Sequence, residues 1–128
     1  MIVHTFERRQ PLVIVEVTVI VNGKVKIFHF AVDTGATITL VSDDAMKKMG
    51  YTKADSIKTT QTITASKSET VCEYNLDNIM AIGLIRRNFK VLSRSLPVGL
   101  SIDGLLGLNF FKNKELTIDF KLSEIRLK

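Results

Sequence analysis

The sequence has few residues of the kinds that bind metals or form disulfides. It contains 1 cysteine, Cys72, and 2 histidines, His4 and His29. A single cysteine cannot form an intramolecular disulfide, and so few thiols and imidazoles argue against a zinc site. We therefore expect neither a metal nor a cofactor, and we interpret Cys72 as a small buried hydrophobic residue. A lone thiol is typical of a reducing, cytoplasmic setting.

Long apolar runs are also missing. The most apolar stretch, residues 12–21, contains Glu16, and it is half as long as the roughly 20 apolar residues that a membrane-spanning helix needs. The acidic Glu7 precedes this stretch and no small-residue cleavage site follows it, unlike the order found in a signal peptide. We expect no membrane association and no targeting segment.

No block of one charge sign explains the basic balance of the chain. The 18 Lys and Arg residues exceed the 13 Asp and Glu residues by +5, but they are spread along the sequence, and the densest groups are pairs such as Arg8-Arg9 and Arg86-Arg87. This distribution favours a solvated surface over a nucleic-acid partner. The length of 128 residues and the 45% hydrophobic content predict one domain over residues 1–128 with a core of its own.

Strand-forming segments fill most of the chain. Residues 12–32 form two β-branched and aromatic runs around Asn22-Gly23, which predicts a hairpin with a type I′ turn. The valines at 13, 15, 17, 19 and 21 share one face of the first run, which predicts a sheet with one buried side. Further strands are predicted at residues 38–41, 59–64, 69–74, 78–82, 88–92, 116–121 and 124–127.

A short helix is predicted over Asp43–Met49. Ser42 can cap its first turn and Gly50 can adopt the left-handed conformation that ends it. Residues 65–68 form a small polar turn between two of the predicted strands, which indicates a second hairpin. The fold class is therefore all-β.

Two segments differ from this β background. In residues 31–37, Asp33-Thr34-Gly35 follows directly after a buried strand; taken alone, this tripeptide fits an aspartate that forms a turn. In residues 102–111, apolar residues lead into Gly107 and then into a helical turn.

Together, in this order and at this separation, the two segments resemble the single-domain, retropepsin-like aspartic proteases, and in particular the prokaryotic members of that family. The resemblance implies a closed, acid-protease-like β-barrel with one or two short helices and one lobe per chain. It also implies an aspartic endopeptidase that acts as a homodimer on peptide or protein substrates, with Asp33 as its catalytic residue.

The chemistry explains why one motif per chain requires a dimer. Hydrolysis without a metal or a covalent intermediate needs one group to take a proton from water and another to give one to the carbonyl oxygen. Two carboxylates about 3 Å apart cannot both ionise, so one serves as the acid and the other as the base. With a single Asp-Thr-Gly in 128 residues, the second carboxylate must be Asp33 of a partner chain.

The resemblance also assigns supporting roles. Thr34 would bond across the dimer interface, and Gly35 would bring its N–H close to the carboxylates. The loop would be supported by Leu105, Leu106 and Gly107. Ala36 has no hydroxyl to stabilise the ionised pair, so we expect a pH optimum nearer neutral than in enzymes with serine at this position.

Asp103 is the other acid beside a motif. We expect it to bond backbone N–H groups of a loop, without a catalytic part. Buried Tyr74 would pack within its strand. The C-terminal run, residues 116–128, would either join the dimer interface or close the barrel.

A flap that covers the substrate would include Ala65, Ser66 and Lys67, and residues 64–68 contain no glycine. The alternative function is a catalytically inactive, dimeric peptide- or protein-binding domain of the same fold. Retention of Asp33 favours an enzyme, because a buried, paired carboxylate is costly to keep. The tripeptide also fits the phosphate loop of sugar kinases, but that fold needs two large lobes, which this length does not supply.

Overall fold

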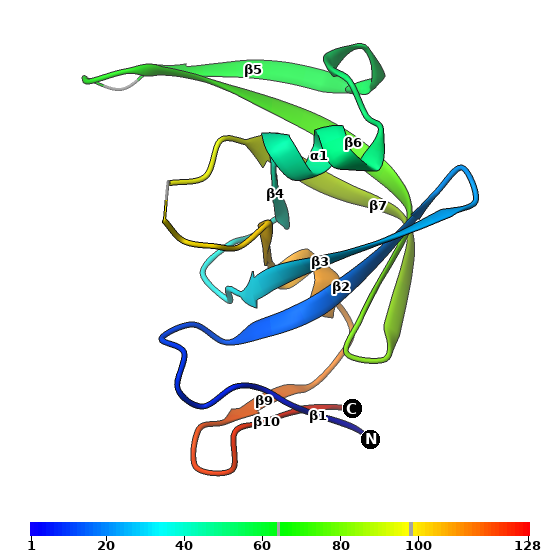
Figure 1. The fold of residues 1–128 in the computed structure, drawn as a ribbon, viewed down its shortest axis with the longest axis vertical. Helices are drawn as coiled ribbons and strands as arrows, with labels where there is room; N and C mark the ends of the chain where they lie inside the picture. Colours follow the sequence, from blue (N-terminus) through cyan, green and yellow to red (C-terminus); the bar gives the residue numbers. More distant parts are fainter. Residues whose placement is uncertain (64, 98) are drawn as a thin grey trace.

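The computed structural model describes residues 1–63, 65–97 and 99–128, and most of them lie in strands (Figure 1). The strands are β1 (Ile2–Thr5), β2 (Ile14–Val21), β3 (Lys24–Val32), β4 (Leu40–Ser42), β5 (Lys58–Ile63), β6 (Ser68–Ala81), β7 (Leu84–Arg94), β8 (Gly104–Leu106), β9 (Leu116–Asp119) and β10 (Glu124–Leu127). The helices are α1 (Asp43–Met49) and the short 3-10 helices η1 (Lys53–Asp55) and η2 (Leu108–Phe111).

Among the described residues, six strands close into a mixed barrel in the order β2-β3-β8-β4-β7-β6. The seam that closes it is the antiparallel pairing of β2 with β6, in which Val17 pairs with Ala81 and Ile20 with Asn78. Parallel pairs join β3 to β8 and β4 to β7. The predicted closed, all-β barrel with one lobe in this chain is confirmed.

The first hairpin forms as its sequence predicts. Asn22 and Gly23 both have positive φ, 50° and 75°, as a type I′ turn requires. Along β2 the valines from Val15 to Val21 are buried, whereas Glu16 and Ile20 are exposed. The apolar face of this hairpin forms one wall of the core inside the barrel.

The second hairpin is larger than the sequence predicts. β5 pairs along its length with the first part of β6 and projects from the barrel (Figure 1); Thr64, the last residue of the predicted strand, lies outside the described residues. β6 is one strand of 14 residues, where two strands, 69–74 and 78–82, were predicted. Polar Asn75 and Asp77 disfavour a strand by propensity, but they lie exposed on either side of buried Leu76. The strand continues beyond them, with its buried positions shifted by one residue between Leu76 and Ile79.

β7 also exceeds its predicted range of 88–92. It begins after a tight turn at Ile82 and Gly83, both with positive φ, and antiparallel pairing with β6 continues from Ala81 to Cys72. The extended pairing makes β6 and β7 the longest ribbon of the fold. It connects the projecting hairpin to the barrel.

Helix α1 has the predicted ends. The Ala45 N–H donates to the Ser42 hydroxyl oxygen at 3.0 Å, and Gly50 ends the helix with φ 95°. The preceding strand, β4, lies slightly later than the predicted 38–41. In the part of the chain that the structure describes, no helix has the length and apolar character needed to cross a bilayer.

The C-terminal run forms a sheet of its own. β9 and β10 join β1 in the order β1-β10-β9 at the end of the molecule opposite the projecting hairpin (Figure 1). Ile125 and Leu127 of β10 are buried in the core. Because the seam between β2 and β6 closes the barrel, the structure excludes one of the two alternatives for residues 116–128, that they close the barrel.

Candidate active site

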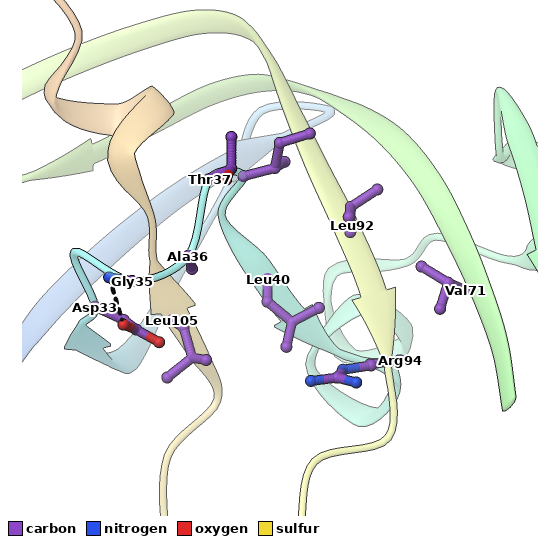
Figure 2. Close-up of a pocket in the computed structure, with 10 residues that line it drawn as sticks. Asp33, Gly35, Ala36, Thr37, Leu40, Val71, Leu92, Arg94 and Leu105 are labelled. Atoms are coloured by element: carbon purple, nitrogen blue, oxygen red, sulfur yellow. Dashed lines mark hydrogen bonds between the residues drawn. The ribbon is translucent and has the colours of Figure 1, made fainter. Parts of the chain in front are cut away.

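The carboxylate of Asp33 is held by the turn in which it lies. Asp33 follows β3 directly, and its N–H donates to the Leu106 carbonyl at 2.9 Å. The Gly35 N–H then donates to the Asp33 Oδ1 atom at 2.9 Å (Figure 2). The Ala36 N–H closes the turn on the Asp33 carbonyl at 3.2 Å. The carboxylate is therefore fixed in direction while it remains half-exposed.

The residue after Asp33 faces outward. Thr34 is exposed, as is Gly35. A Cβ at Gly35 would lie 3.2 Å from the Asp33 Oδ1 atom, a tight contact that would press on the carboxylate. The absence of a side chain at Gly35 thus allows its N–H to approach Asp33.

The segment Leu105-Leu106-Gly107 lies directly under this turn. β8 fits between β3 and β4, so that Leu106 pairs with Val32 and Leu105 pairs with Leu40. At Gly107 a Cβ would lie 2.7 Å from the Ala36 carbonyl oxygen, a backbone atom that cannot move away easily. The structure therefore brings the two sequence motifs into contact, as the resemblance implies.

Two polar residues that the sequence analysis missed connect these segments. Thr39 is fully buried, and its N–H and hydroxyl both donate to the Asn109 Oδ1 atom at 2.8 Å. The Gly107 N–H donates to the Thr39 hydroxyl oxygen at 3.0 Å. Each is a polar residue surrounded by apolar residues in the sequence. This pattern could have indicated that the two side chains are buried and bond to partners, because buried polar groups need partners.

A cavity of about 450 Å³ opens beside the Asp33 carboxylate (Figure 2). Its walls come from the Asp33 turn, from β4 and β8, and from the facing strands β6 and β7. The lining residues are Asp33, Gly35, Ala36, Thr37, Ile38, Leu40, Val71, Leu92, Arg94 and Leu105. Most are apolar, and Asp33 and Arg94 are the charged members among the described residues. Such a cavity suits an apolar side chain held next to a carboxylate.

The predicted flap residues lie at the end of the β5–β6 hairpin. Ala65, Ser66 and Lys67 are exposed, and they do not line the Asp33 cavity as far as the described residues show. The Lys67 ammonium lies 2.8 Å from the Glu69 carboxylate. This hydrogen bond, with the charges of Lys67 and Arg94, lowers the pKa of Glu69. The end of the hairpin therefore contains an ionised carboxylate between two cations.

Asp103 lies on the outer side of β3. Its Oδ2 atom accepts the His29 N–H at 2.9 Å, and the two backbones also bond, Asp103 N–H to the His29 carbonyl, at 2.8 Å. Asp103 thus bonds a backbone N–H as expected, but the donor lies in strand β3 and not in a loop. Cys72 and Tyr74 are buried in β6, as predicted. Within the described residues, no three His, Cys, Asp or Glu side chains gather into a metal-binding cluster.

Comparisons with known proteins agree with this geometry. A family model described as "Aspartyl protease" matches residues 16–110. A retropepsin-like aspartic protease from Rickettsia conorii has a similar structure, with 22% identity, a TM-score of 0.71, and coverage of 99% of this chain and 97% of that one. The retroviral protease-like domain of Ddi1 from Leishmania major is 15% identical, with a TM-score of 0.66 and coverage of 94% and 90%. No curated protein matches the sequence significantly.

Proposed function

This chain belongs to the aspartyl protease family, and we propose that it is an endopeptidase whose active site forms where two copies place their Asp33 carboxylates side by side. The observation that carries the proposal is the anchored Asp33 carboxylate at the edge of an apolar cavity. One chain supplies one such carboxylate. A two-fold axis through the site would supply the second from the same position of a partner.

The paired carboxylates would share a single proton. The ionised one would take a proton from a water molecule, and the protonated one would donate to the carbonyl oxygen of the peptide bond. As the water oxygen bonds to the carbonyl carbon, a tetrahedral intermediate forms. It would collapse when the carboxyl group that took the water proton gives it to the amide nitrogen, the C–N bond breaks, and the other carboxylate regains its proton from a hydroxyl of the intermediate. In the pair, Gly35 would keep each carboxylate oriented through its N–H, and exposed Thr34 would bond across the interface. Ala36, which offers no hydroxyl, would leave the ionised form without that extra donor.

The cavity would bind the substrate side chain next to the scissile bond. Leu40, Leu92 and Leu105 provide apolar contacts there, which supports peptides with an apolar residue at that position. The β5–β6 hairpin, with Ala65, Ser66 and Lys67 at its end, would cover the bound peptide and exclude water. Leu106 and Gly107 would act through packing alone.

The proposed setting is the cytoplasm. Cys72 is a free thiol and only 4% exposed, which supports a reducing compartment. The proposed partners are a second copy of the chain and a peptide or protein substrate, without nucleic acid or membrane.

A second candidate is a dimer of the same fold that binds peptides without cutting them. The flap segment favours this candidate, because residues 64–68 contain no glycine and a stiffer flap would close less readily. The cavity could still bind a peptide, because apolar contacts with its walls do not require a pair of Asp33 carboxylates.

Cleavage of a diverse peptide library by the wild type and by Asp33→Asn tests the proposal. We expect a protein of dimer mass to cleave between pH 4 and 8, to be inhibited by pepstatin, and to lose cleavage in Asp33→Asn. Asp77→Asn, which neutralises an exposed acid on β6, is the matched control and should cleave like the wild type. Peptide binding without cleavage by a folded dimer would favour the second candidate, and a protein that stays monomeric would exclude the shared site.

A further inference from the structure

Arg94 is a cation at the wall of the Asp33 cavity with no part in the proposed chemistry. It ends β7 on the same face as Leu92, because side chains alternate along a strand. Figure 2 shows its guanidinium group extending from β7 towards the side of the cavity where Leu40 and Asp33 lie. Ser93 points to the opposite face, where its hydroxyl donates to the Asp43 carboxylate at 2.8 Å.

The contacts of Arg94 leave it able to bind a further carboxylate. Its Nη1 atom lies 3.5 Å from the Glu69 Oε2 atom, and the Lys67 ammonium is closer to the same carboxylate, at 2.8 Å. A guanidinium group has five N–H donors, and one long contact uses few of them. Asp43 lines the neighbouring pocket together with Lys67, Glu69 and Arg94, so what Arg94 offers a further carboxylate is its remaining N–H donors.

Stability does not explain the position of Arg94. Its side chain is 45% exposed in the pair with Glu69, and exposed ion pairs of this kind contribute little to folding. Lys67 already neutralises Glu69. A cation that extends into a cavity whose other charged lining residue, among those described, is Asp33 is better explained by what enters the cavity.

We propose that Arg94 selects substrates that carry an aspartate or glutamate side chain close to the scissile bond. This inference rests on the proposed function and adds a substrate class to it: peptides with an apolar residue at the bond and an acidic residue within the reach of the guanidinium group. The planar guanidinium fits a carboxylate with two parallel hydrogen bonds. In a two-fold symmetric dimer each half contributes one Arg94, so the acidic preference applies on both sides of the bond.

Paired peptide pools test the preference. Each pool of short peptides has glutamate or glutamine fixed at one position, and the ratio of kcat/KM for the two pools is measured position by position. For the wild type we expect glutamate to be favoured about fivefold at a position on each side of the bond. Arg94→Met should bring the ratio to about one, and Arg94→Glu should invert it. Arg87→Met, which removes an exposed cation elsewhere on β7, is the matched control and should keep the wild-type ratio.

Equal cleavage of the glutamate and glutamine pools by the wild type would overturn the role of Arg94 while the protease remained established. A protein that cleaves no pool would count against the proposed function. In that case the binding of the two pools tests the role of Arg94. Retention of the two pools on immobilised Asp33→Asn protein should favour glutamate about fivefold, and Arg94→Met in the same background should remove the difference. Equal retention, or none, would reject the selection by Arg94.

Discussion

Asn109 accepts two hydrogen bonds from Thr39, one from the backbone N–H and one from the hydroxyl, both at 2.8 Å. The amide nitrogen of Asn109 donates in turn to the Lys90 carbonyl at 2.8 Å. A single side chain thus fixes the end of the Asp33 loop to η2 and to β7. The loop that carries Asp33 is therefore held by the Asn109 side chain as well as by the hydrogen bonds of its own turn.

Replacing Asn109 by alanine should destabilise the protein and reduce its activity. The mutation leaves the buried N–H and hydroxyl of Thr39 without their acceptor, which costs about 2 kcal/mol of the free energy of unfolding. Urea unfolding measures this loss, and cleavage per folded protein measures the displacement of Asp33. Asn75→Ala, at an exposed position of β6, should change stability by about 0.5 kcal/mol or less. Equal stability of Asn109→Ala and the wild type would contradict the structural role.

Alanine at Gly107 and alanine at Gly35 should have different effects. At Gly107 the Cβ would lie 2.7 Å from the Ala36 carbonyl oxygen and 2.9 Å from the Thr39 nitrogen, and relieving such overpacking costs about 1–3 kcal/mol of stability. At Gly35 the Cβ would meet only the Asp33 carboxylate, so Gly35→Ala should fold and lose activity. Thermal melting and peptide cleavage of the two variants separate the effects. If Gly107→Ala melted like the wild type, the close packing under the loop would be disproved.

Asp103→Ala should affect stability more than catalysis. It removes the acceptor of the His29 N–H, at the point where β3 meets the segment before β8, and the loss of this bond costs about 1–2 kcal/mol. Denaturant unfolding gives the change in stability, and the rate per folded molecule gives the change in catalysis. A stable but inactive Asp103→Ala protein would show that Asp103 takes part in the reaction.

Asp119 should make stability depend on pH in the acid range. The Leu122 N–H, followed by Arg126 and the Lys121 N–H, lowers the pKa of Asp119 below its ordinary value of 3.8. A lowered native pKa contributes stability above the unfolded pKa, and this contribution is lost as the pH falls through the native value. Asp119→Asn should therefore melt below the wild type at neutral pH, and the difference should shrink as the pH falls through the lowered native pKa of Asp119. A melting difference that does not change with pH would contradict this origin.

Ala36→Ser should shift the pH optimum of cleavage towards acid. A hydroxyl at this position can donate to the ionised carboxylate of the pair and favour that form at lower pH. Ala36→Cys adds a side chain of similar size with a much weaker donor and serves as the control. The pH profiles of kcat/KM for the three proteins provide the measurement. An optimum for Ala36→Ser at or above the wild-type value would show that position 36 does not reach the carboxylates.

Local signals predicted the local structure. Asn22-Gly23 specified its turn, and Ser42 and Gly50 specified both ends of α1, because each of these residues acts within a few positions of itself. The β6 strand was predicted as two, since Asn75 and Asp77 have low strand propensity. Pairing with β5, β7 and β2 outweighs that propensity. These partner strands lie elsewhere in the sequence, so the residues next to Asn75 and Asp77 do not reveal the pairing.

Long-range contacts at the site were only partly predictable. The resemblance placed Gly107 near the Asp33 loop, and the structure brings the two segments together. The bond between Thr39 and Asn109 joins residues 70 positions apart, and neither residue belongs to a motif by itself. Arg94 was one of many dispersed cations in the sequence. Only the alternation at the end of β7 and the position of that strand end beside the Asp33 loop show that Arg94 faces the cavity.

The support of the Asp33 loop by β8 and η2 also sets when the site can form during synthesis. Asp33 leaves the ribosome long before Leu106, whose carbonyl accepts its N–H, and before Asn109, which holds Thr39. A nascent chain that has reached only the β5–β6 hairpin therefore contains Asp33 without the β8 and η2 segments that support its loop. In the proposed protease, cleavage would begin only after translation has passed Asn109, and until then the growing polypeptide would carry no assembled site of its own.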